Sequence, residues 1–237
     1  MKMHAPIPYL LFTALMLNAT ASQAVVVYAN DFQLAAGNEW SHTTLQSAPT
    51  PYAFGSRSFL GEFGNDTVSL NLSGLTPHST LTLSFDLYLI RTWDGSSSGT
   101  AFDFGNDSFK VDVGSGPVLL DQTFSNGNPA GQSFGPAAIN PQFTGAAETY
   151  SLGYIVTDGM PAPQVMDSVY KLSYTFAHAT DQLTLNFSGY GLQAMSDESW
   201  GLDNVQVSMV PEPAAAPMLA LGMLALAWRV RRRMTAA

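Results

Sequence analysis

The sequence contains no cysteine, and it has few basic residues away from its ends. Without cysteine, a disulfide scaffold and cysteine-based zinc sites are excluded. Residues 25–210 contain 17 acidic residues and only four basic ones: Arg57, Arg91, Lys110 and Lys171. The net charge of this segment is therefore about −13. So few cations could not neutralise a phosphate backbone, which argues against a nucleic-acid partner. An acidic segment of this kind suits cations or neutral sugars, or simply keeps the protein soluble.

Metal-ligating histidines and helical patterns are also scarce. Between residues 25 and 210 the histidines are His42, His78 and His178, far apart in sequence and without ligand-like spacing, so zinc is not expected. No stretch there combines a helical apolar stripe with helix caps.

The apolar residues instead alternate with a period of two. In Thr80–Ile90 every second residue is apolar, and Thr82, Ser84 and Asp86 fall on the opposite face. This alternation predicts a half-buried strand. Similar runs, separated by Gly, Pro, Asn, Asp and Ser turns, predict about ten strands: Val25–Phe32, Phe54–Phe59, Val68–Leu72, Phe109–Val113, Pro117–Phe124, Tyr150–Val156, Tyr170–Phe176, Leu183–Phe187 and Leu202–Val207.

These strands predict one all-β domain over residues 25–209. Each predicted strand has one apolar face, so an antiparallel two-sheet sandwich, or jelly roll, is the expected architecture. The segment Ser125–Glu148 is rich in Gly, Pro and Ala and low in charge, and we expect it to form a long loop.

The amino end has the composition of a signal peptide. Residues 1–24 begin with Lys2, continue with an apolar stretch and end in Ser22-Gln23-Ala24, which suits cleavage by a signal peptidase after Ala24. The apolar stretch is short for a membrane span, which needs about 20 residues. An uncleaved signal anchor is the alternative.

The carboxyl end has three parts in a fixed order. Val210-Pro211-Glu212-Pro213 comes first, followed by an apolar stretch expected to form a transmembrane helix over about 214–230. A basic cluster comes last, preceded by an interfacial tryptophan: Trp228, Arg229, Arg231, Arg232 and Arg233. The prolines break regular structure, and the arginines would hold the tail on the cytoplasmic side.

This tail, residues 210–237, resembles the PEP-CTERM sorting signal, which is sometimes labelled the C-terminal domain of an ice-binding protein. The resemblance implies that an exosortase removes the tail at or near the motif. The protein would be exported, anchored in the inner membrane with its domain facing the periplasm, and then released to the cell surface or the extracellular matrix. A plain single-span anchor is the alternative.

The two ends of the domain carry a looser resemblance. Ala29-Asn30-Asp31-Phe32-Gln33 and Asp197-Glu198-Ser199-Trp200-Gly201-Leu202-Asp203-Asn204-Val205 look like the first and last strands of laminin-G-like, MAM-like and carbohydrate-binding jelly rolls. The resemblance implies a structural calcium ion with Asp203 as ligand, Asp31 nearby and Glu198 as a further candidate. Calcium takes 6–8 oxygen ligands. Alternatively, Asp203-Asn204 forms a turn or caps backbone groups.

A second acidic cluster indicates a sugar site. Trp93, Asp94, Asp103 and Asp107 lie close together in sequence, near Phe104. An aromatic ring provides a flat apolar platform for a sugar, and carboxylates accept hydrogen bonds from its hydroxyls. The alternative is ordinary turn chemistry beside a tryptophan of the core.

No catalytic motif stands out, so we do not expect an enzyme. The Glu-x-Asp-x-x-Glu pattern of jelly-roll glucanases is missing, and Gly95–Gly99 matches a nucleophile elbow without the helix that the elbow requires. The sequence favours a non-catalytic surface or matrix protein that binds exopolysaccharide. A structural envelope protein without a specific ligand and an enzyme acting on polysaccharide are the alternatives.

Overall fold

The computed structural model describes residues 23–49, 57–97, 104–127, 131–157, 160–211 and 222–223. Most of the signal peptide and of the sorting tail lies outside these residues. Several predicted features are therefore not described: the Glu212-Pro213 half of the motif, Asp103, residues 54–56 of the strand expected over Phe54–Phe59, the transmembrane segment apart from residues 222–223, and the basic cluster with Trp228. Within the described ranges, no helix is long and apolar enough to span a membrane.

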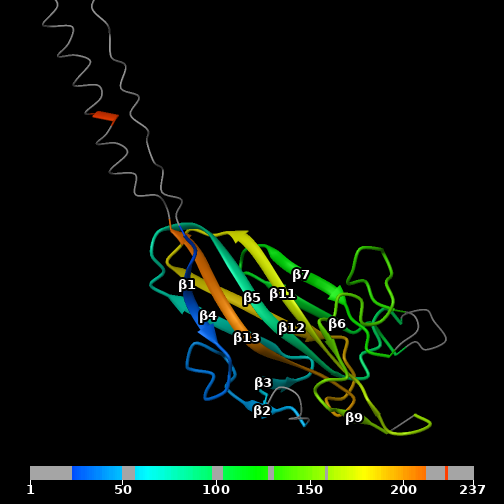
Figure 1. Ribbon diagram of the computed structural model, residues 1–237. Coiled ribbons are helices and arrows are strands. Elements are labelled where there is room, and N and C mark those ends of the chain that lie inside the picture. The colour runs from blue at the N-terminus through cyan, green and yellow to red at the C-terminus, as the bar shows by residue number, and fades with distance from the viewer. Residues whose placement is uncertain are drawn as a thin grey trace, which may run out of the picture.

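The described chain forms thirteen strands in two main antiparallel sheets and one small one (Figure 1). The larger sheet has the order β2-β3-β13-β5-β11-β8, with β1 also paired to β13. Its strands are β1 (Val25–Asn30), β2 (Leu45–Ser47), β3 (Ser58–Phe63), β5 (His78–Arg91), β8 (Glu148–Thr149), β11 (Asp167–Ala177) and β13 (Glu198–Pro211).

The smaller main sheet has the order β4-β12-β6-β7. Its strands are β4 (Thr67–Ser73), β6 (Ser108–Asp112), β7 (Val118–Thr123) and β12 (Gln182–Tyr190), while β9 (Ile155–Val156) and β10 (Gln164–Val165) pair only with each other. All pairings are antiparallel, so the predicted all-β jelly-roll sandwich is confirmed for the described residues.

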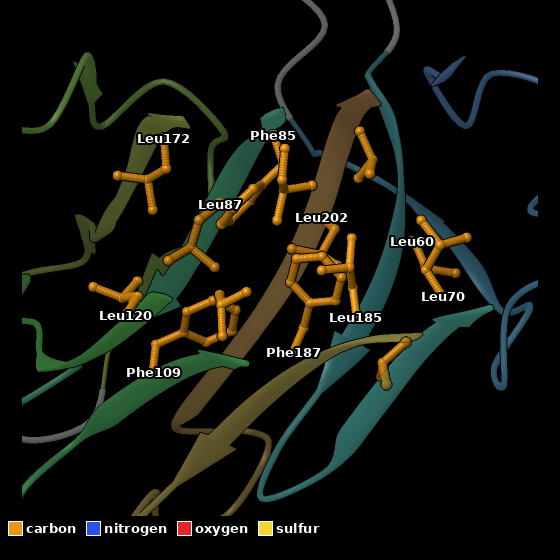
Figure 2. Close-up of a cluster of buried hydrophobic side chains, with 14 of the residues drawn as sticks. Leu60, Leu70, Phe85, Leu87, Phe109, Leu120, Leu172, Leu185, Phe187 and Leu202 are labelled. Carbon is orange, nitrogen blue, oxygen red and sulfur yellow. The ribbon is translucent and has the colours of Figure 1, made fainter. Parts of the chain in front are cut away.

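The main core lies between the two sheets, where alternate side chains from each sheet meet (Figure 2). In β5 the inward residues are Leu81, Leu83, Phe85, Leu87 and Leu89, each at most 2 % exposed. They are the residues that the alternation placed on one face. Burying a side chain of this size stabilises the fold by roughly 1.5–3 kcal/mol, so this strand alone makes a large contribution.

A second, smaller cluster covers one end of the outer face of the larger sheet. It consists of Ala48, Phe59, Tyr88, Ile90, Leu152, Tyr154 and Val169. The expectation of a strand over Tyr150–Val156 was wrong for most of that segment, because only Ile155–Val156 form a strand. Residues 152–154 instead pack onto the sheet, where their backbone N–H groups bind a buried carboxylate of β11 rather than a neighbouring strand.

In its described part, the predicted long loop from Ser125 to Glu148 is confirmed, and it packs against the sandwich. Gln132 is fully buried, and its side-chain Nε2 donates to the carbonyl oxygens of Phe134 and Thr144, both at 2.9 Å. Phe134 stacks on Phe124 of the core, with ring centroids 4.8 Å apart.

Candidate functional site

A bulge in β13 shapes the outer face of the larger sheet. The pairing of β13 with β5 shifts register between Asp203 and Gln206, and Asn204 takes a left-handed conformation with φ +50°. Three hollows of about 370, 390 and 560 Å³ adjoin this bulge, and Asn204 lines all three. Together they form an extended surface of polar side chains and apolar patches over β1, β13, β5 and β11, which we call the Asn204 groove.

The middle hollow, of about 390 Å³, contains the densest set of polar side chains. These come from outward positions on neighbouring strands and from loops beside them: Asp31, Gln33, Arg57, Asp86, Tyr88, Glu148, Lys171, Asp203 and Asn204. Arg57 and Glu148 form an ion pair of 2.8 Å, and Asn204 Nδ2 donates to Asp86 Oδ2 at 2.9 Å. Both hydrogen-bond donors and acceptors therefore face one hollow.

The predicted calcium residue Asp203 lies at the floor of this hollow. It is only 4 % exposed, and its Oδ2 accepts a hydrogen bond of 2.7 Å from the Tyr88 hydroxyl. Its Oδ1 accepts the backbone N–H of Asn204 at 2.7 Å. Burial raises the pKa of Asp203 to about 6, with a smaller contribution from nearby Asp86, and burial also raises the pKa of Tyr88. Asp31 lines the same hollow, as expected from the paired end segments.

Glu198, the third predicted calcium ligand, lies elsewhere. It opens β13 at the end of the sandwich away from Asp31, and it meets Asp94 and Asp107, which had been assigned to a separate sugar site. One carboxylate oxygen from each of these three residues lies within 4.8 Å of the other two. We call this group the acidic triad. No other group of three potential metal ligands is so close together among the described residues.

Short loops hold the acidic triad in place. Asp94 follows β5 and Asp107 precedes β6, and the two segments are joined by hydrogen bonds from Asp94 N to Asp107 Oδ2 and from Asp107 N to Gly95 O. The turn before β13 supplies Gln193, whose backbone N–H donates to Glu198 Oε2 at 2.6 Å. Its side chain donates to Asp94 Oδ2 at 3.2 Å.

Burial dominates the electrostatics of the acidic triad. Asp107 and Glu198 are fully buried, and Asp94 is partly exposed. Burial raises the pKa of Glu198 and of Asp107. The charges of Asp107 and Asp94 raise the pKa of Glu198 further, and the charge of Asp94 does the same for Asp107, whereas a hydrogen bond with Glu198 lowers the pKa of Asp107. Burial likewise raises the pKa of Asp94 to about 6, with a smaller contribution from Asp197. The three groups cannot all ionise at neutral pH without a compensating positive charge.

The aromatic residues near the triad differ in exposure. Trp93 is fully buried in the main core, and its Nε1 donates to the carbonyl oxygen of Ser199 at 2.8 Å. A buried ring offers no face to a sugar. Trp93 is therefore a core residue, which was the alternative to a sugar-binding role. Phe104, in contrast, is 56 % exposed.

Sequence reasoning missed most of the groove. Lys171 and Tyr88 occupy outward positions on strands that were correctly predicted, and Asp86 was noted only as a polar residue of β5. The sequence does show charged residues at outward positions of several predicted strands. That these residues lie together on one surface could not be predicted without knowing the order of the strands in the sheet. The same holds for the histidines, since His78 Nε2 lies 2.8 Å from His178 Nδ1 despite 100 residues of separation.

No protein-family model matches the chain, and no curated protein matches it by sequence. Several solved structures share a distant likeness. The K3 cleaved adhesin domain of Lys-gingipain from Porphyromonas gingivalis is 13 % identical, covers 78 % of this chain and 99 % of its own, and has a TM-score of 0.36. The mannohexaose complex of the carbohydrate-binding module CBM27-1 from Caldicellulosiruptor saccharolyticus is 17 % identical, with coverage of 81 % and 99 % and a TM-score of 0.31.

A third similar structure is much longer than this chain. The exo-β-1,3-galactanase of Phanerochaete chrysosporium is 11 % identical with a TM-score of 0.32, and the match covers 76 % of this chain but only 29 % of the galactanase. All of these TM-scores are below 0.5. The assignment of this chain to the antiparallel jelly-roll sandwiches therefore rests on its own strand order and on the core between its two sheets.

Proposed function

We propose that this chain is an exported envelope protein whose sandwich domain binds polysaccharide without catalysis. The observation that carries the proposal is the Asn204 groove. It is an extended and shallow surface, and the side chains that line it are mostly polar and include both charge signs.

The side chains of the groove suit sugar hydroxyls. Lys171 and Arg57 carry hydrogen-bond donors, and Asp31 and Asp86 carry acceptors. A sugar hydroxyl is itself both donor and acceptor, so a surface with interspersed donors and acceptors can pair with successive hydroxyls of a neutral polymer. Leu34, which is 95 % exposed at the rim, provides an apolar contact for a sugar ring.

A catalytic role for the acidic triad is disfavoured by its burial. Glycosidases place two carboxyl groups on either side of the scissile bond, in a cleft that admits the sugar. Asp107 and Glu198 are both fully buried, so a sugar ring could not be placed between them.

Sugar binding can be tested with the purified full-length protein. Affinity electrophoresis against a panel of neutral and acidic polysaccharides is expected to show retardation by at least one of them. Lys171→Ala and Asp31→Ala should weaken this retardation. The matched control is Lys110→Ala, because Lys110 lies on the smaller sheet in an ion pair with Asp112 at 3.3 Å. Unchanged binding by both groove variants, or equal loss in the control, would contradict the proposal.

Export and sorting form the second part of the proposal. The tail motif and the signal peptide support it, and so does the position of the domain's two ends. Val25 pairs with Met209, so the start of β1 and the end of β13 lie at the same end of the sandwich (Figure 1). A domain tethered there would keep most of the sandwich away from the membrane.

Intact mass and cell fractionation of the native protein, with and without the sorting protease, test this part. A mature chain that begins at Val25, ends near Pro211–Pro213 and is found outside the cells is expected. A chain that keeps its tail in the inner membrane when the protease is active would instead identify a plain anchored protein.

Calcium as a structural ion is a third part of the proposal. Asp31 and Asp203 lie in one hollow beside the middle of β13, while Glu198 belongs to the acidic triad at the start of that strand. The two groups are therefore competing places for the ion, and conservative variants of each can tell them apart.

A further inference from the structure

Two carboxylate oxygens of the acidic triad have no N–H or hydroxyl donor, and a proton shared between Asp107 and Glu198 is the hydrogen bond open to them. Asp107 places Oδ2 on the backbone N–H of Asp94, and Glu198 places Oε2 on the backbone N–H of Gln193. The remaining oxygens, Asp107 Oδ1 and Glu198 Oε1, are buried without a donor. Buried polar atoms in folded proteins are almost always paired, so two unpaired carboxylate oxygens in one cluster indicate a missing partner.

No basic side chain supplies that partner in the described part of the chain. The ion pairs there are Arg57–Glu148, Arg91–Glu62 and Lys110–Asp112, and none of them involves Asp107 or Glu198. A buried carboxylate without a counter-charge is strongly destabilising unless it is protonated or bound to a cation. Here two such groups lie next to a third carboxyl group. A bound cation compensates the charge of all three at once, whereas protonation would have to neutralise the groups one by one.

We propose that Asp94, Asp107 and Glu198 bind a calcium ion, in a site distinct from the Asp31–Asp203 hollow. The inference is independent of polysaccharide binding. It uses carboxyl groups that the proposed groove does not contain.

The ligand chemistry favours calcium over other common cations. All three candidate ligands are carboxylate oxygens, which suit hard cations, whereas zinc in proteins prefers His and Cys. Magnesium demands a near-ideal octahedron and retains several waters, which is difficult in a buried cluster. Calcium accepts 6–8 oxygens in irregular geometry, so it tolerates ligands that come from three separate segments.

The ion would connect parts of the chain that are far apart in sequence. Asp94 lies three residues after β5, Asp107 directly precedes β6, and Glu198 opens β13, so the ligands come from segments that adjoin both sheets. A cation there would join the two sheets at the end of the sandwich that lies away from the chain ends. We therefore expect calcium to stabilise the whole domain.

Terbium luminescence tests the site directly. Terbium replaces calcium at oxygen sites, and Trp93 adjoins Asp94 in the chain, so excitation of tryptophan in the full-length protein should sensitise terbium emission. Added calcium should compete the emission away. Calcium at about 100 times its dissociation constant should also raise the melting temperature by about 5–10 °C relative to chelator. Absence of both effects would overturn the proposal and leave a proton-sharing acid cluster.

Conservative variants locate the site. Glu198→Gln and Asp107→Asn should each weaken calcium binding by at least about tenfold. Mutating a residue that only orients a metal ligand already lowers metal affinity by about this factor, and loss of the ligand itself should lower it at least as much. The matched control is Asp203→Asn, a buried carboxyl group of the other hollow, which should keep the calcium response. The reverse pattern would overturn the assignment and place the ion at Asp203.

Folding of the variants is checked by their behaviour without calcium. Removing one of several crowded buried charges should leave the calcium-free variants at least as stable as the calcium-free wild type at neutral pH. If both triad variants fail to fold, Asp94→Asn takes their place, since Asp94 is partly exposed. A folded Asp94→Asn protein with unchanged calcium affinity would overturn the proposal. Failure of sugar binding would leave these results unaffected.

Discussion

One buried carboxylate, Asp167 at the start of β11, holds the segment that covers the outer face of the larger sheet. Its Oδ1 accepts the N–H of Leu152 at 3.0 Å, and its Oδ2 accepts those of Gly153 and Tyr154 at 2.9 and 3.1 Å. The side chains of Leu152 and Tyr154 complete the second hydrophobic cluster. A single carboxyl group thus takes the place of a strand partner for this segment.

We therefore expect Asp167→Ala to destabilise the protein by roughly 2–4 kcal/mol, because three buried backbone donors lose their acceptor. Chemical denaturation measures the change. Asp181→Ala, at an exposed position in the turn before β12, is the control and should change stability by less than about 0.5 kcal/mol. Equal stability of the two variants would show that residues 152–154 are held mainly by their side chains.

The histidine pair provides a second prediction about single residues. His78 Nδ1 donates to the carbonyl oxygen of Thr76 at 2.7 Å, so in the neutral form its Nε2 accepts from His178 Nδ1 at 2.8 Å. Burial lowers the pKa of His178, and the adjacent His78 ring lowers it further. The folded protein therefore binds a proton less readily at this site than the unfolded chain.

Because the folded pKa is depressed, the stability contributed by the pair is present above the unfolded pKa of about 6.5 and decreases as the pH falls below it. The difference in melting temperature between the wild type and His178→Gln should accordingly shrink between pH 8 and pH 5. The acidic triad has raised pKa values, so its effect on stability changes with pH in the opposite direction. Both proteins contain the triad, and its effect therefore cancels in the difference between their melting temperatures. A constant difference would contradict the lowered pKa.

Single residues were predicted well from sequence where position along a strand decides their environment. The apolar residues of β5 point inward as the alternation indicated, and Asp31 and Asp203 share a hollow. The position of Glu198 was not predictable in this way. Its carboxyl group meets Asp94 and Asp107 only because β13 lies next to β5 in one sheet while Asp107 leads into the other. Such a contact depends on long-range topology, which a local pattern does not contain.

At the scale of elements, the bulge in β13 is the feature on which the groove depends. Asn204 adopts φ +50°, a conformation that asparagine and glycine tolerate and that β-branched residues do not. Its side chain also donates to Asp86 across to β5. The bulge turns both Asp203 and Asn204 towards the outer face, while Leu202 and Val205 on either side remain in the core.

We predict that Asn204→Val costs about 1–2 kcal/mol of stability through backbone strain. Asn204→Gly keeps the backbone conformation and loses only the side-chain contact, so it is the matched control. Denaturation of both variants separates the two effects. If the glycine variant is destabilised as much as the valine variant, the Asp86 contact and not the backbone conformation accounts for the loss.

Elements with strong alternation were predictable, and short ones were not. The patterns over Thr80–Ile90, Tyr170–Phe176 and Leu183–Phe187 correspond to β5, β11 and β12, because each of these strands buries one face against the main core. The two-residue strands β8, β9 and β10 are too short to show a period. Tyr150–Val156 misled the prediction because its apolar residues pack on the outer face of the larger sheet, with a carboxylate instead of a strand as hydrogen-bond acceptor.

At the scale of the whole molecule, β13 connects the acidic triad to the start of the tail. Glu198 at one end of the strand pairs with Arg91, and Pro211 at the other end pairs with His78. With a rise of about 3.3 Å per residue, the triad lies about 40 Å from the point where the tail begins. An anchored protein would therefore present the proposed calcium site far from the membrane, with the groove along the side between them.

This arrangement determines how many carboxyl-terminal residues can be removed without unfolding the domain. Val205, Val207 and Met209 are buried in the main core, and residues 205–209 also pair with β1. The paired part of β13 ends at Pro211. Cleavage near the Pro-Glu-Pro motif would thus remove the tail without taking any core residue.

We therefore predict that a chain shortened after Pro213 unfolds cooperatively at the same temperature as the full-length protein. A chain shortened after Asp203 should not fold, since it lacks three core residues and the strand that joins β1 to the larger sheet. Circular dichroism during thermal unfolding compares the two. Loss of cooperative unfolding in the longer of the two would mean that the domain depends on its tail, and removal of that tail by a sorting protease would then be incompatible with a folded product.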